Sequence, residues 1–252
     1  MRTSLEGFRQ LRSPGPCPGG DADTIALSRR PFLLGGVGAL GALAFISAVT
    51  RTLAAPAQYP ETIDALGQAA GAEMTAHLRY VGFAGQAHDE GYRGIAYLFT
   101  GLATSELIHA QNYHRILAQL GELIDFGAAR QTEVGDTQTN LISAAEAELN
   151  TIDNVYPEIL RRLEPEQLDA AILNVTYAWE SHKQHRDLIA KILRWSPSFF
   201  ESVAKKIDGK TDKLYVCAIC GSTLHEVPSE QCPICRFEVS HYRLIPLETF
   251  LG

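Results

Sequence analysis

The sequence predicts a mainly α-helical protein, in which an antiparallel four-helix bundle is followed by a small, metal-stabilised β ribbon. Two observations predict this class. Apolar residues recur with helical period over residues 61–194. From residue 213 onward, the Ala, Leu and Glu typical of the helices give way to Tyr, Val, Cys, Gly and Pro. Because some forty residues cannot bury much of a core, we expect a metal cluster to stabilise this second domain.

The composition fits a folded protein and argues against a nucleic-acid partner. The chain has 252 residues, of which 46% are apolar, so a sizeable core is possible. Asp and Glu number 29 against 22 Lys and Arg, which gives a formal net charge of −7, and no basic run interleaved with aromatic residues occurs. Binding to DNA or RNA is therefore not expected.

Residues 1–57 are predicted to be an export signal. The run Ser-Arg-Arg-Pro-Phe-Leu at 28–33 opens an uncharged, apolar stretch over 31–50, and small residues follow at 55–57. This order of charged, apolar and small residues is typical of a cleaved signal peptide. The run resembles the twin-arginine (Tat) export signal, which implies a periplasmic protein. The uncharged stretch is also long enough to span a bilayer, so an uncleaved membrane anchor is the alternative.

The bundle is expected in residues 58–196, followed by a connector, 197–212, and the ribbon domain, 213–252. The helical pattern breaks at glycine and proline residues, and the helices are expected near 61–89, 94–120, 137–163 and 165–194. Pro157 is expected to kink the third helix, and Pro165 to lie in the first turn of the fourth. Antiparallel packing of these helices is the natural arrangement.

Each expected helix carries Glu or His on its otherwise apolar stripe. The stripe of the third helix, for example, includes Ile152, Val155 and Ile159. In the fourth helix the histidines are on the stripe, whereas Glu180 falls on a wetter face. The polar residues predicted to point inward are Glu73, Glu106, His109, Glu148, His182 and His185.

These inward residues favour a metal site. Unpaired buried carboxylates are costly and three of them repel one another, whereas a multivalent cation removes both problems. Glu106 and His109 have the i, i+3 spacing with which di-iron or di-manganese bundles present two ligands from one helix. A single Glu-x-x-His pair is more often solvated than bound to a metal. A single inward His is likewise more often a hydrogen-bonded core residue than a metal ligand. The coincidence in all four helices favours the metal.

Four of the five cysteines form a second cluster. They make two Cys-x-x-Cys turns, at Cys217 and Cys220 and at Cys232 and Cys235. Two such turns bring four thiolates to a tetrahedral centre that suits either Zn²⁺ or a single iron. A structural zinc ribbon and a redox disulfide pair are alternatives. The predicted di-metal site in the same chain favours iron, because a one-electron centre tethered to it makes a short electron path.

Together these motifs resemble rubrerythrins, in which a ferritin-like di-iron bundle precedes a rubredoxin-like domain. The resemblance covers residues 61–252 and rests on Gly71-Ala-Glu73 with Arg79-Tyr80, Glu106-Leu-Ile-His109, Glu148 ahead of Tyr156-Pro157, and the paired cysteine turns. It implies that the di-iron ligands are Glu73, Glu106, His109, Glu148 and His185, and that the four cysteines bind a rubredoxin-type iron. It further implies that Tyr80 and Tyr156 donate hydrogen bonds to ligand carboxylates.

The chain departs from the rubrerythrin pattern at two positions. His182 stands where the family has a carboxylate expected to bridge the metals, and Thr151 stands where it has a further Glu. A neutral imidazole cannot bridge two metals as a carboxylate does. The departures therefore point to weaker, asymmetric or mononuclear metal binding, with His182 as a terminal ligand.

The resemblance implies an oxidoreductase that reduces hydrogen peroxide. Electrons would come from an unidentified donor, enter at the cysteine-bound iron and pass to the bundle metals, and the protein would be a homo-oligomer. The alternative is a non-enzymatic iron-binding or iron-handling protein with a structural zinc ribbon. The two departures favour that alternative.

Overall fold

The structure, a computed structural model, describes residues 58–126, 133–193 and 213–246 of the chain. These residues fall within one compact unit. The predicted export signal, 1–57, and the predicted connector, 197–212, lie outside the described residues. Within the described ranges, no helix combines the length and the apolar character needed to cross a membrane.

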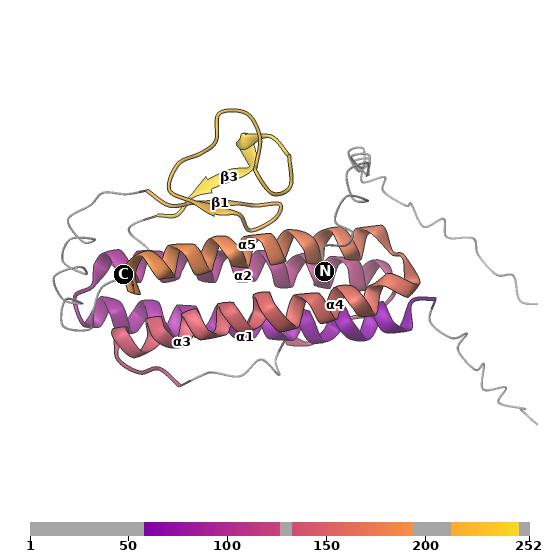
Figure 1. Cartoon of the computed structure of the whole chain (residues 1–252), viewed down its shortest axis with the longest axis horizontal. Helices are drawn as coiled ribbons and strands as arrows, with labels where there is room; N and C mark the ends of the chain where they lie inside the picture. Colours follow the sequence, from indigo (N-terminus) through magenta and orange to yellow (C-terminus); the bar gives the residue numbers. More distant parts are fainter. Residues whose placement is uncertain (1–57, 127–132, 194–212, 247–252) are drawn as a thin grey trace, which may run out of the picture. The chain divides into compact units, whose positions relative to one another are not determined.

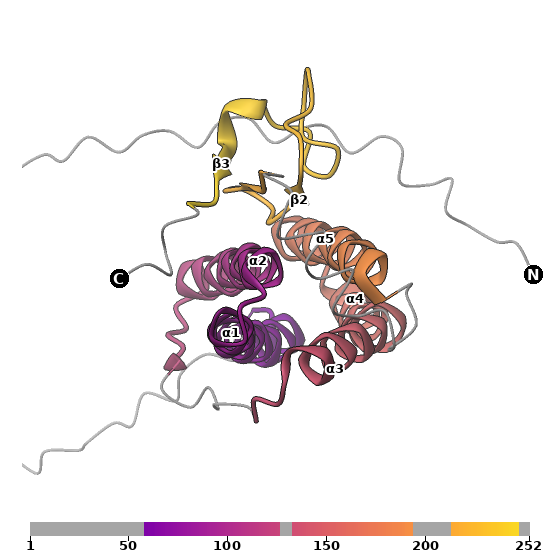
Figure 2. The same cartoon turned by 90° about the vertical axis from the view of Figure 1, so that its left-hand side faces the viewer.

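The described helices form a bundle (Figure 1). They are α1 (Pro60–Asp89), α2 (Arg93–Gln119), α3 (Thr137–Asn150), α4 (Tyr156–Leu163) and α5 (Asp169–Leu193). A π-helical turn joins α3 to α4, so that these two make one continuous rod. Figure 2 shows the rods end-on, arranged around a common axis. The mainly helical class and the four-helix bundle predicted from the sequence are confirmed.

Contacts at the two ends of the bundle fix the directions of the helices. At one end the backbone N–H groups of Glu61 and Thr62 donate to the carboxylate of Glu166, at 3.0 and 2.8 Å, so α1 begins beside the junction of α4 and α5. At the other end the N–H of Thr137 donates to Glu90 at 3.0 Å, so α3 begins where α1 ends. Because α2 also begins there, α2 and α3 run in the same direction. Two consecutive helices that run in the same direction are typical of ferritin-like bundles.

Local sequence explains where these helices begin and end. The side chain of Asp136 accepts a hydrogen bond from the N–H of Thr139 at 2.7 Å and caps α3. Pro60 lies in the first turn of α1. Backbone N–H groups there have no acceptor within the helix, so the missing N–H of proline costs no hydrogen bond. Gly91 and Gly121 follow α1 and α2 with φ of +83° and +87°, the left-handed conformation that glycine adopts without strain.

The third rod contains the π-helical turn, Thr151–Val155, which the sequence pattern does not predict. Such a turn holds one residue more than an α-helical turn, so it rotates the residues of α4 around the axis of the rod. The expectation that Val155 faces inward is therefore wrong: its side chain is 36% exposed, and Tyr156 is fully buried instead. The indole N–H of Trp179 donates to the carbonyl of Ile152 at 2.9 Å and so satisfies a backbone group of this turn.

One of the two helix prolines lies elsewhere than the sequence predicts. Pro157 lies inside the third rod as expected, in the first turn of α4, directly after the π-helical turn. Pro165 lies in a short 3₁₀ turn, Glu164–Glu166, and not in the fourth long helix. Gln167 then takes a left-handed φ of 51°, which ends that turn before α5 begins at Asp169. Pro157 has no N–H to donate to the preceding π-helical turn, where the indole of Trp179 supplies a donor to Ile152 instead.

The core of the bundle consists of two apolar layers with polar residues between them. One layer gathers around Phe83 and Phe99, and the other around Leu66 and Leu117. The polar slab between them, at mid-length of the rods, is made of the buried side chains of Glu73, Glu106, His109, Glu148, His182 and His185. Charged groups at such depth need compensating partners.

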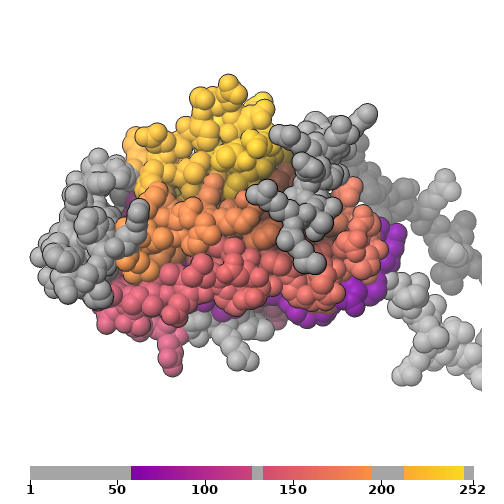
Figure 3. Space-filling model, viewed as in Figure 1, coloured from indigo at the N-terminus to yellow at the C-terminus, as the bar shows by residue number. Residues whose placement is uncertain are grey.

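The ribbon domain is a three-stranded antiparallel sheet with the order β2-β1-β3. Its strands are β1 (Tyr215–Cys217), β2 (Thr223–Leu224) and β3 (Tyr242–Leu244). The ribbon lies against α2 and α5, on one flank of the bundle (Figures 2 and 3). A small sheet region with the four cysteines is thus confirmed.

Apolar contacts join the ribbon to the bundle. Leu214, Val216 and Ile245 belong to the same apolar layer as residues of α1, α2 and α5. The hydroxyl of Tyr97 donates to the carbonyl of Ile245 at 2.8 Å. A Cβ atom at Gly101 would lie 2.1 Å from the side chain of Leu214, so glycine there lets the ribbon approach α2 without displacing that leucine.

Candidate metal centres

One group of possible ligands lies between α1, α2 and α5. Ligand atoms of Glu73, Glu106, His109 and His182 all lie within 4.8 Å of one another, and all four residues are buried. Nε2 of His182 is 3.5 Å from Oε2 of Glu73 and 3.5 Å from Oε2 of Glu106. Nδ1 of His109 is 2.9 Å from the same oxygen of Glu106. Such separations suit ligands around one cation with bonds of ~2.0–2.2 Å.

A second group shares Glu106 and His182 with the first and adds Glu148 and His185. Nδ1 of His185 is 3.2 Å from Oε1 of Glu106 and 3.6 Å from Oε1 of Glu148. Glu106 therefore turns one oxygen toward each group, as a bridging carboxylate does. The two groups together form a candidate di-metal site in the polar slab.

Three buried atoms of the slab have no hydrogen-bond partner in the described part of the chain. They are Oε1 of Glu106, Nε2 of His182 and Nδ1 of His185. Leaving one buried polar atom unsatisfied costs about 1–3 kcal/mol, so three at one point call for an explanation. All three face the carboxylates of the slab, and bonds to cations would satisfy them. The residues present therefore fit a pair of metal ions.

Buried tyrosines donate hydrogen bonds to the carboxylates of the slab. The hydroxyl of Tyr80 donates to Oε1 of Glu148 at 2.6 Å, and that of Tyr156 donates to Glu73. Burial, together with the charge of Glu148, raises the pKa of Tyr80 well above its usual range, so this phenol remains a donor. Tyr113, whose hydroxyl donates to Tyr156 at 3.2 Å, extends the network. Sequence reasoning misses Tyr113 because it counts as an ordinary stripe residue.

The charges of the slab are strongly coupled. Burial alone would raise the pKa of Glu148, but the charge of His182 and its hydrogen bond at 2.6 Å lower that pKa to about 2. Burial alone would lower the pKa of His185, but the charge of Glu106 outweighs it and raises that pKa to about 9. Imidazolium and carboxylate groups therefore neutralise one another when no metal is bound. A metal ion would replace protons on the histidines.

Contacts from the ribbon orient two of the histidines. Nε2 of His109 lies 3.1 Å from the carbonyl oxygen of Cys220, which can only accept, so Nε2 carries the proton and Nδ1 is free to bind a cation. Nε2 of His185 lies 3.4 Å from the hydroxyls of Ser181 and Thr223. Sequence reasoning misses both hydroxyls, since no motif marks them. The ribbon thus helps to direct the Nδ1 atoms of both rings toward the carboxylates.

The four cysteines of the ribbon converge as the sequence predicts. The Sγ atoms of Cys217 and Cys235 are 3.8 Å apart, and those of Cys220 and Cys232 are 3.5 Å apart. All four are buried, and none forms a disulfide. A tetrahedral centre with metal–sulfur bonds of ~2.3 Å places its sulfur atoms ~3.8 Å apart. The cluster therefore has the dimensions of a four-thiolate metal site.

The first cysteine turn touches the metal slab through a glycine. Gly221 has a φ of +78°, and a Cβ atom there would lie 2.3 Å from Nε2 of His109 and 2.6 Å from Oγ of Ser105. The hydroxyl of Ser105 donates to the carbonyl of Gly221 at 2.7 Å. Glycine is therefore required for both the turn and the close approach of the ribbon to a ligand histidine.

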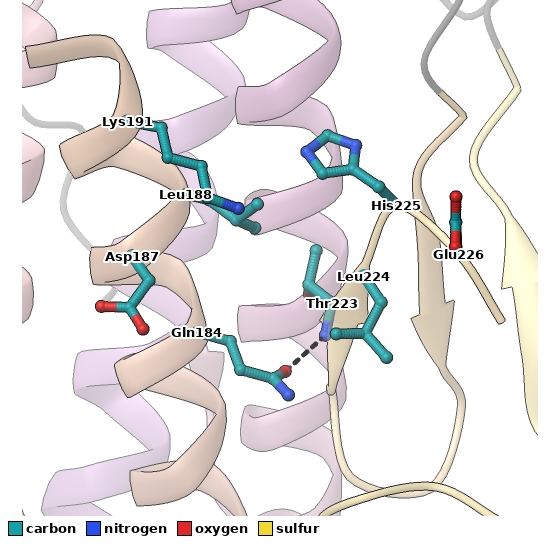
Figure 4. Close-up of a pocket in the computed structure, with 8 residues that line it drawn as sticks. All are labelled: Gln184, Asp187, Leu188, Lys191, Thr223, Leu224, His225 and Glu226. Atoms are coloured by element: carbon teal, nitrogen blue, oxygen red, sulfur yellow. Dashed lines mark hydrogen bonds between the residues drawn. The ribbon is translucent and has the colours of Figure 1, made fainter. Parts of the chain in front are cut away.

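A pocket of about 420 Å³ opens between α5 and the ribbon (Figure 4). Gln184 and Lys191 line it from α5, and Thr223 and His225 line it from the ribbon. Gln184 accepts a hydrogen bond from the N–H of Thr223 at 3.0 Å (Figure 4). Thr223 therefore borders the pocket and also contacts His185, a residue of the slab.

Several polar residues near the slab do not belong to it. The side chain of Glu180 is 46% exposed and pairs with Lys183 at 2.5 Å, in agreement with its predicted wet face. Nδ1 of His77 bonds to the carbonyl of Ala103 at 2.8 Å. Thr151, which stands where the rubrerythrin pattern has Glu, begins the π-helical turn.

Comparison with known proteins identifies the family. The family model described as Rubrerythrin matches residues 64–193. Rubrerythrin-2 of Clostridium acetobutylicum is 33% identical over 176 residues, which cover 69% of this chain and 91% of that protein. The chain belongs to the rubrerythrin family. Nigerythrin of Nitratidesulfovibrio vulgaris is another similar protein. It is 28% identical over 174 residues, which cover 69% of this chain and 81% of nigerythrin.

Solved structures agree with this assignment to the rubrerythrin family. Nigerythrin in its fully reduced, all-ferrous state matches with a TM-score of 0.63 and 26% identity, covering 73% of this chain and 86% of that one. A bacterioferritin of Desulfovibrio desulfuricans matches with a TM-score of 0.53 and 20% identity, and the match covers 61% of this chain and 90% of the bacterioferritin chain. It shows the shared bundle fold. Family membership and the two donor clusters confirm the predicted cofactors, iron in the bundle and a metal in the four-cysteine site.

Proposed function

We propose that this rubrerythrin-family protein reduces hydrogen peroxide to water, with electrons passing from the four-cysteine iron to the bundle metals. The contact between ribbon and bundle carries the proposal. Cys220, a proposed ligand of the ribbon iron, accepts a hydrogen bond through its carbonyl from His109 at 3.1 Å. The other ring nitrogen of His109 is 2.9 Å from Glu106, in the slab. Covalent and hydrogen bonds thus connect the two sites through one imidazole.

The reaction needs two electrons and two protons for each peroxide molecule and yields two water molecules. Iron in the bundle would supply electrons and polarise the O–O bond as a Lewis acid. The residues proposed to hold it are Glu73, Glu106, His109, Glu148, His182 and His185. Tyr80 and Tyr156 keep the carboxylates oriented through their hydrogen bonds. Repeated turnover requires an external electron donor.

Peroxide titration of the reduced protein tests the proposal. The chain is purified from its native host, reduced without oxygen, freed of reductant and titrated with hydrogen peroxide. We expect the colour of the oxidised four-cysteine iron to return with one peroxide consumed per two electrons. Glu180→Ala, on the wet face of α5, serves as the control and should behave as the wild type, whereas Glu106→Ala should lose the response. A protein that peroxide does not reoxidise would refute the proposal.

A second candidate is a non-enzymatic iron-handling protein whose ribbon holds zinc. The observation that favours it is His182 in place of a bridging carboxylate, together with Thr151 in place of a further Glu. Metal analysis of the protein from its native host separates the two candidates. Stoichiometric zinc in a colourless ribbon would support this second candidate, and iron there would support electron transfer. Heterologous expression is not a fair test, because thiolate sites readily accept zinc.

The proposal includes export in the folded state through the twin-arginine run at residues 28–33. Unfolded thiols that reach an oxidising compartment risk forming disulfides, so loading metal before export makes chemical sense. Residues 1–60 fused to a reporter should reach the periplasm, and replacing Arg29 and Arg30 by Lys should block this transport. Equal export of both fusions would exclude the twin-arginine route.

The proposal also includes a homo-oligomer. Ile142 and Leu149 lie seven residues apart on one face of α3, and their side chains are 44% and 45% exposed. Apolar side chains exposed together on a helix face favour self-association. Light scattering should give a mass greater than that of one chain, and Ile142→Glu should reduce it. A wild-type protein with the mass of one chain would exclude an oligomer.

A further inference from the structure

His182 faces the slab with the opposite nitrogen from the other two histidines. His109 and His185 turn Nδ1 toward the carboxylates. His182 instead turns Nε2 inward, 3.5 Å from Oε2 of Glu106, while its Nδ1 bonds to Glu148 at 2.6 Å. A carboxylate can only accept, so Nδ1 carries the proton and Nε2 is the nitrogen left for a cation. His182 can therefore serve one metal position and cannot bridge two.

The position that His182 serves is the one with the fuller set of ligands. Its Nε2 is 3.5 Å from Oε2 of Glu73 and 3.5 Å from Oε2 of Glu106. Nδ1 of His109 lies 2.9 Å from the same Glu106 oxygen. Two carboxylates balance the charge of one divalent cation, and two neutral imidazoles complete four donors. This first position is thus complete and neutral.

The second position has fewer available donors. It has Oε1 of Glu106 and Nδ1 of His185, 3.2 Å apart, and it shares Glu148 with other partners. Both oxygens of Glu148 already accept short hydrogen bonds, one from Tyr80 and one from His182, each at 2.6 Å. With Glu73 and Glu106 already balancing the first cation, only Glu148 remains to balance a second. One positive charge would stay buried, and that is costly.

We propose that the bundle binds its two metals unequally and in order. The tight position consists of Glu73, Glu106, His109 and His182, and the weak position of Glu106, Glu148 and His185. Glu106 is the one carboxylate that joins them. This inference rests on the metal binding assumed in the proposed function, but it does not depend on peroxide turnover.

Anaerobic equilibrium dialysis against Fe²⁺ tests the inference, using the full chain with its ribbon iron in place. Iron per chain should rise in two bundle steps, the second at a free Fe²⁺ concentration about tenfold or more above the first, because hydrogen-bonded partners of ligands change metal affinity by about 10–100-fold. His185→Gln should remove the weak step alone. Glu73→Gln should remove the tight step. Glu180→Gln, at the exposed control position of α5, should change neither.

A further variant tests the cause of the inequality. His182→Glu adds a second carboxylate between the metals and should merge the two steps into one. Equal binding of both irons in the wild type, or loss of both steps in His185→Gln, would overturn the inference. If variants fail to fold, as circular dichroism would show, the Mössbauer spectrum of the wild type given one bundle Fe²⁺ per chain decides alone. Ordered binding gives one bundle ferrous signal, to which a second Fe²⁺ adds another, whereas equal binding gives both signals from the start. Two steps without peroxide reoxidation would leave the inference standing and remove the proposed function.

Discussion

Buried imidazoles of the slab, His185 among them, make the stability of the protein depend on pH when the bundle holds no metal. The charge of Glu106 overcomes the effect of burial and raises the pKa of His185 to about 9, from an ordinary value of about 6.5. A raised pKa in the folded state stabilises the fold fully below the unfolded-state pKa, and this stabilisation is lost as the pH rises through the folded-state pKa.

We therefore expect the free energy of unfolding of the protein without bundle metal to fall between about pH 6.5 and just above pH 9. Urea denaturation across this range measures it. His185→Gln should make the decline smaller, since it removes one of the two titrating rings and leaves His182. A wild type and variant with the same dependence on pH would show that His185 is not charged in the folded protein.

The phenol of Tyr156 should matter for metal affinity as well as for stability. Tyr156→Phe removes the donor to Glu73, so we expect a loss of about 1–3 kcal/mol in the free energy of unfolding. Bundle metal affinity should fall by about 10–100-fold. Thr100→Val is the control, because it removes a hydrogen bond from the Thr100 hydroxyl to the carbonyl of Ala96 within α2. An equal loss of metal affinity in both variants would contradict a specific role for Tyr156.

Periodicity alone could find most of the slab residues. A Glu or His at the angular position of Leu and Ile must point inward, and this selects His182 while leaving Glu180 exposed. It could not find Ser181 or Thr223. Their importance depends on contacts with His185, and the contact of Thr223 joins positions 38 residues apart. Such contacts are created by the fold and leave no local pattern.

Among the elements, the long helices were predictable and their irregularities were not. A stripe of apolar residues persists whether or not one extra residue is wound into a turn, so the sequence pattern conceals the π-helical turn Thr151–Val155. The docking of the ribbon was equally hidden. The sequence shows two domains and a connector, whereas the glycines that permit close approach, Gly101 and Gly221, are recognisable only once the elements are packed.

The ribbon element should tune the bundle metals through Thr223. Its hydroxyl donates to the carbonyl of Gly221 at 2.9 Å and lies 3.4 Å from Nε2 of His185. Thr223→Val keeps the shape and removes this oxygen, so we expect bundle metal affinity to fall about tenfold. Thr100→Val is the control, because the hydroxyl of Thr100 donates to the carbonyl of Ala96 within its own helix. Fe²⁺ dialysis of both variants measures the effect, and unchanged affinity in Thr223→Val would contradict the role.

At the scale of the whole described unit, the two metal sites are joined by one close contact. Gly221 allows the ribbon to reach His109, because any side chain there would collide with the ring at 2.3 Å. Gly221→Ala should therefore push the ribbon and the His109 ring apart without replacing any proposed metal ligand. Gly91→Ala is a matched control: φ is +83° there, so the backbone strain of ~1–2 kcal/mol is similar, but no atom lies within 4 Å of the new Cβ.

The most direct test of electron transfer between the sites is a single turnover followed by stopped-flow absorption. Fully reduced protein is mixed with hydrogen peroxide, and the return of the oxidised four-cysteine iron is timed. With iron content equal in all three proteins, we predict that Gly91→Ala matches the wild type and that Gly221→Ala is slower by about tenfold or more, since small displacements of reacting groups carry costs of this order. Reoxidation of Gly221→Ala at the wild-type rate would contradict electron transfer through this contact.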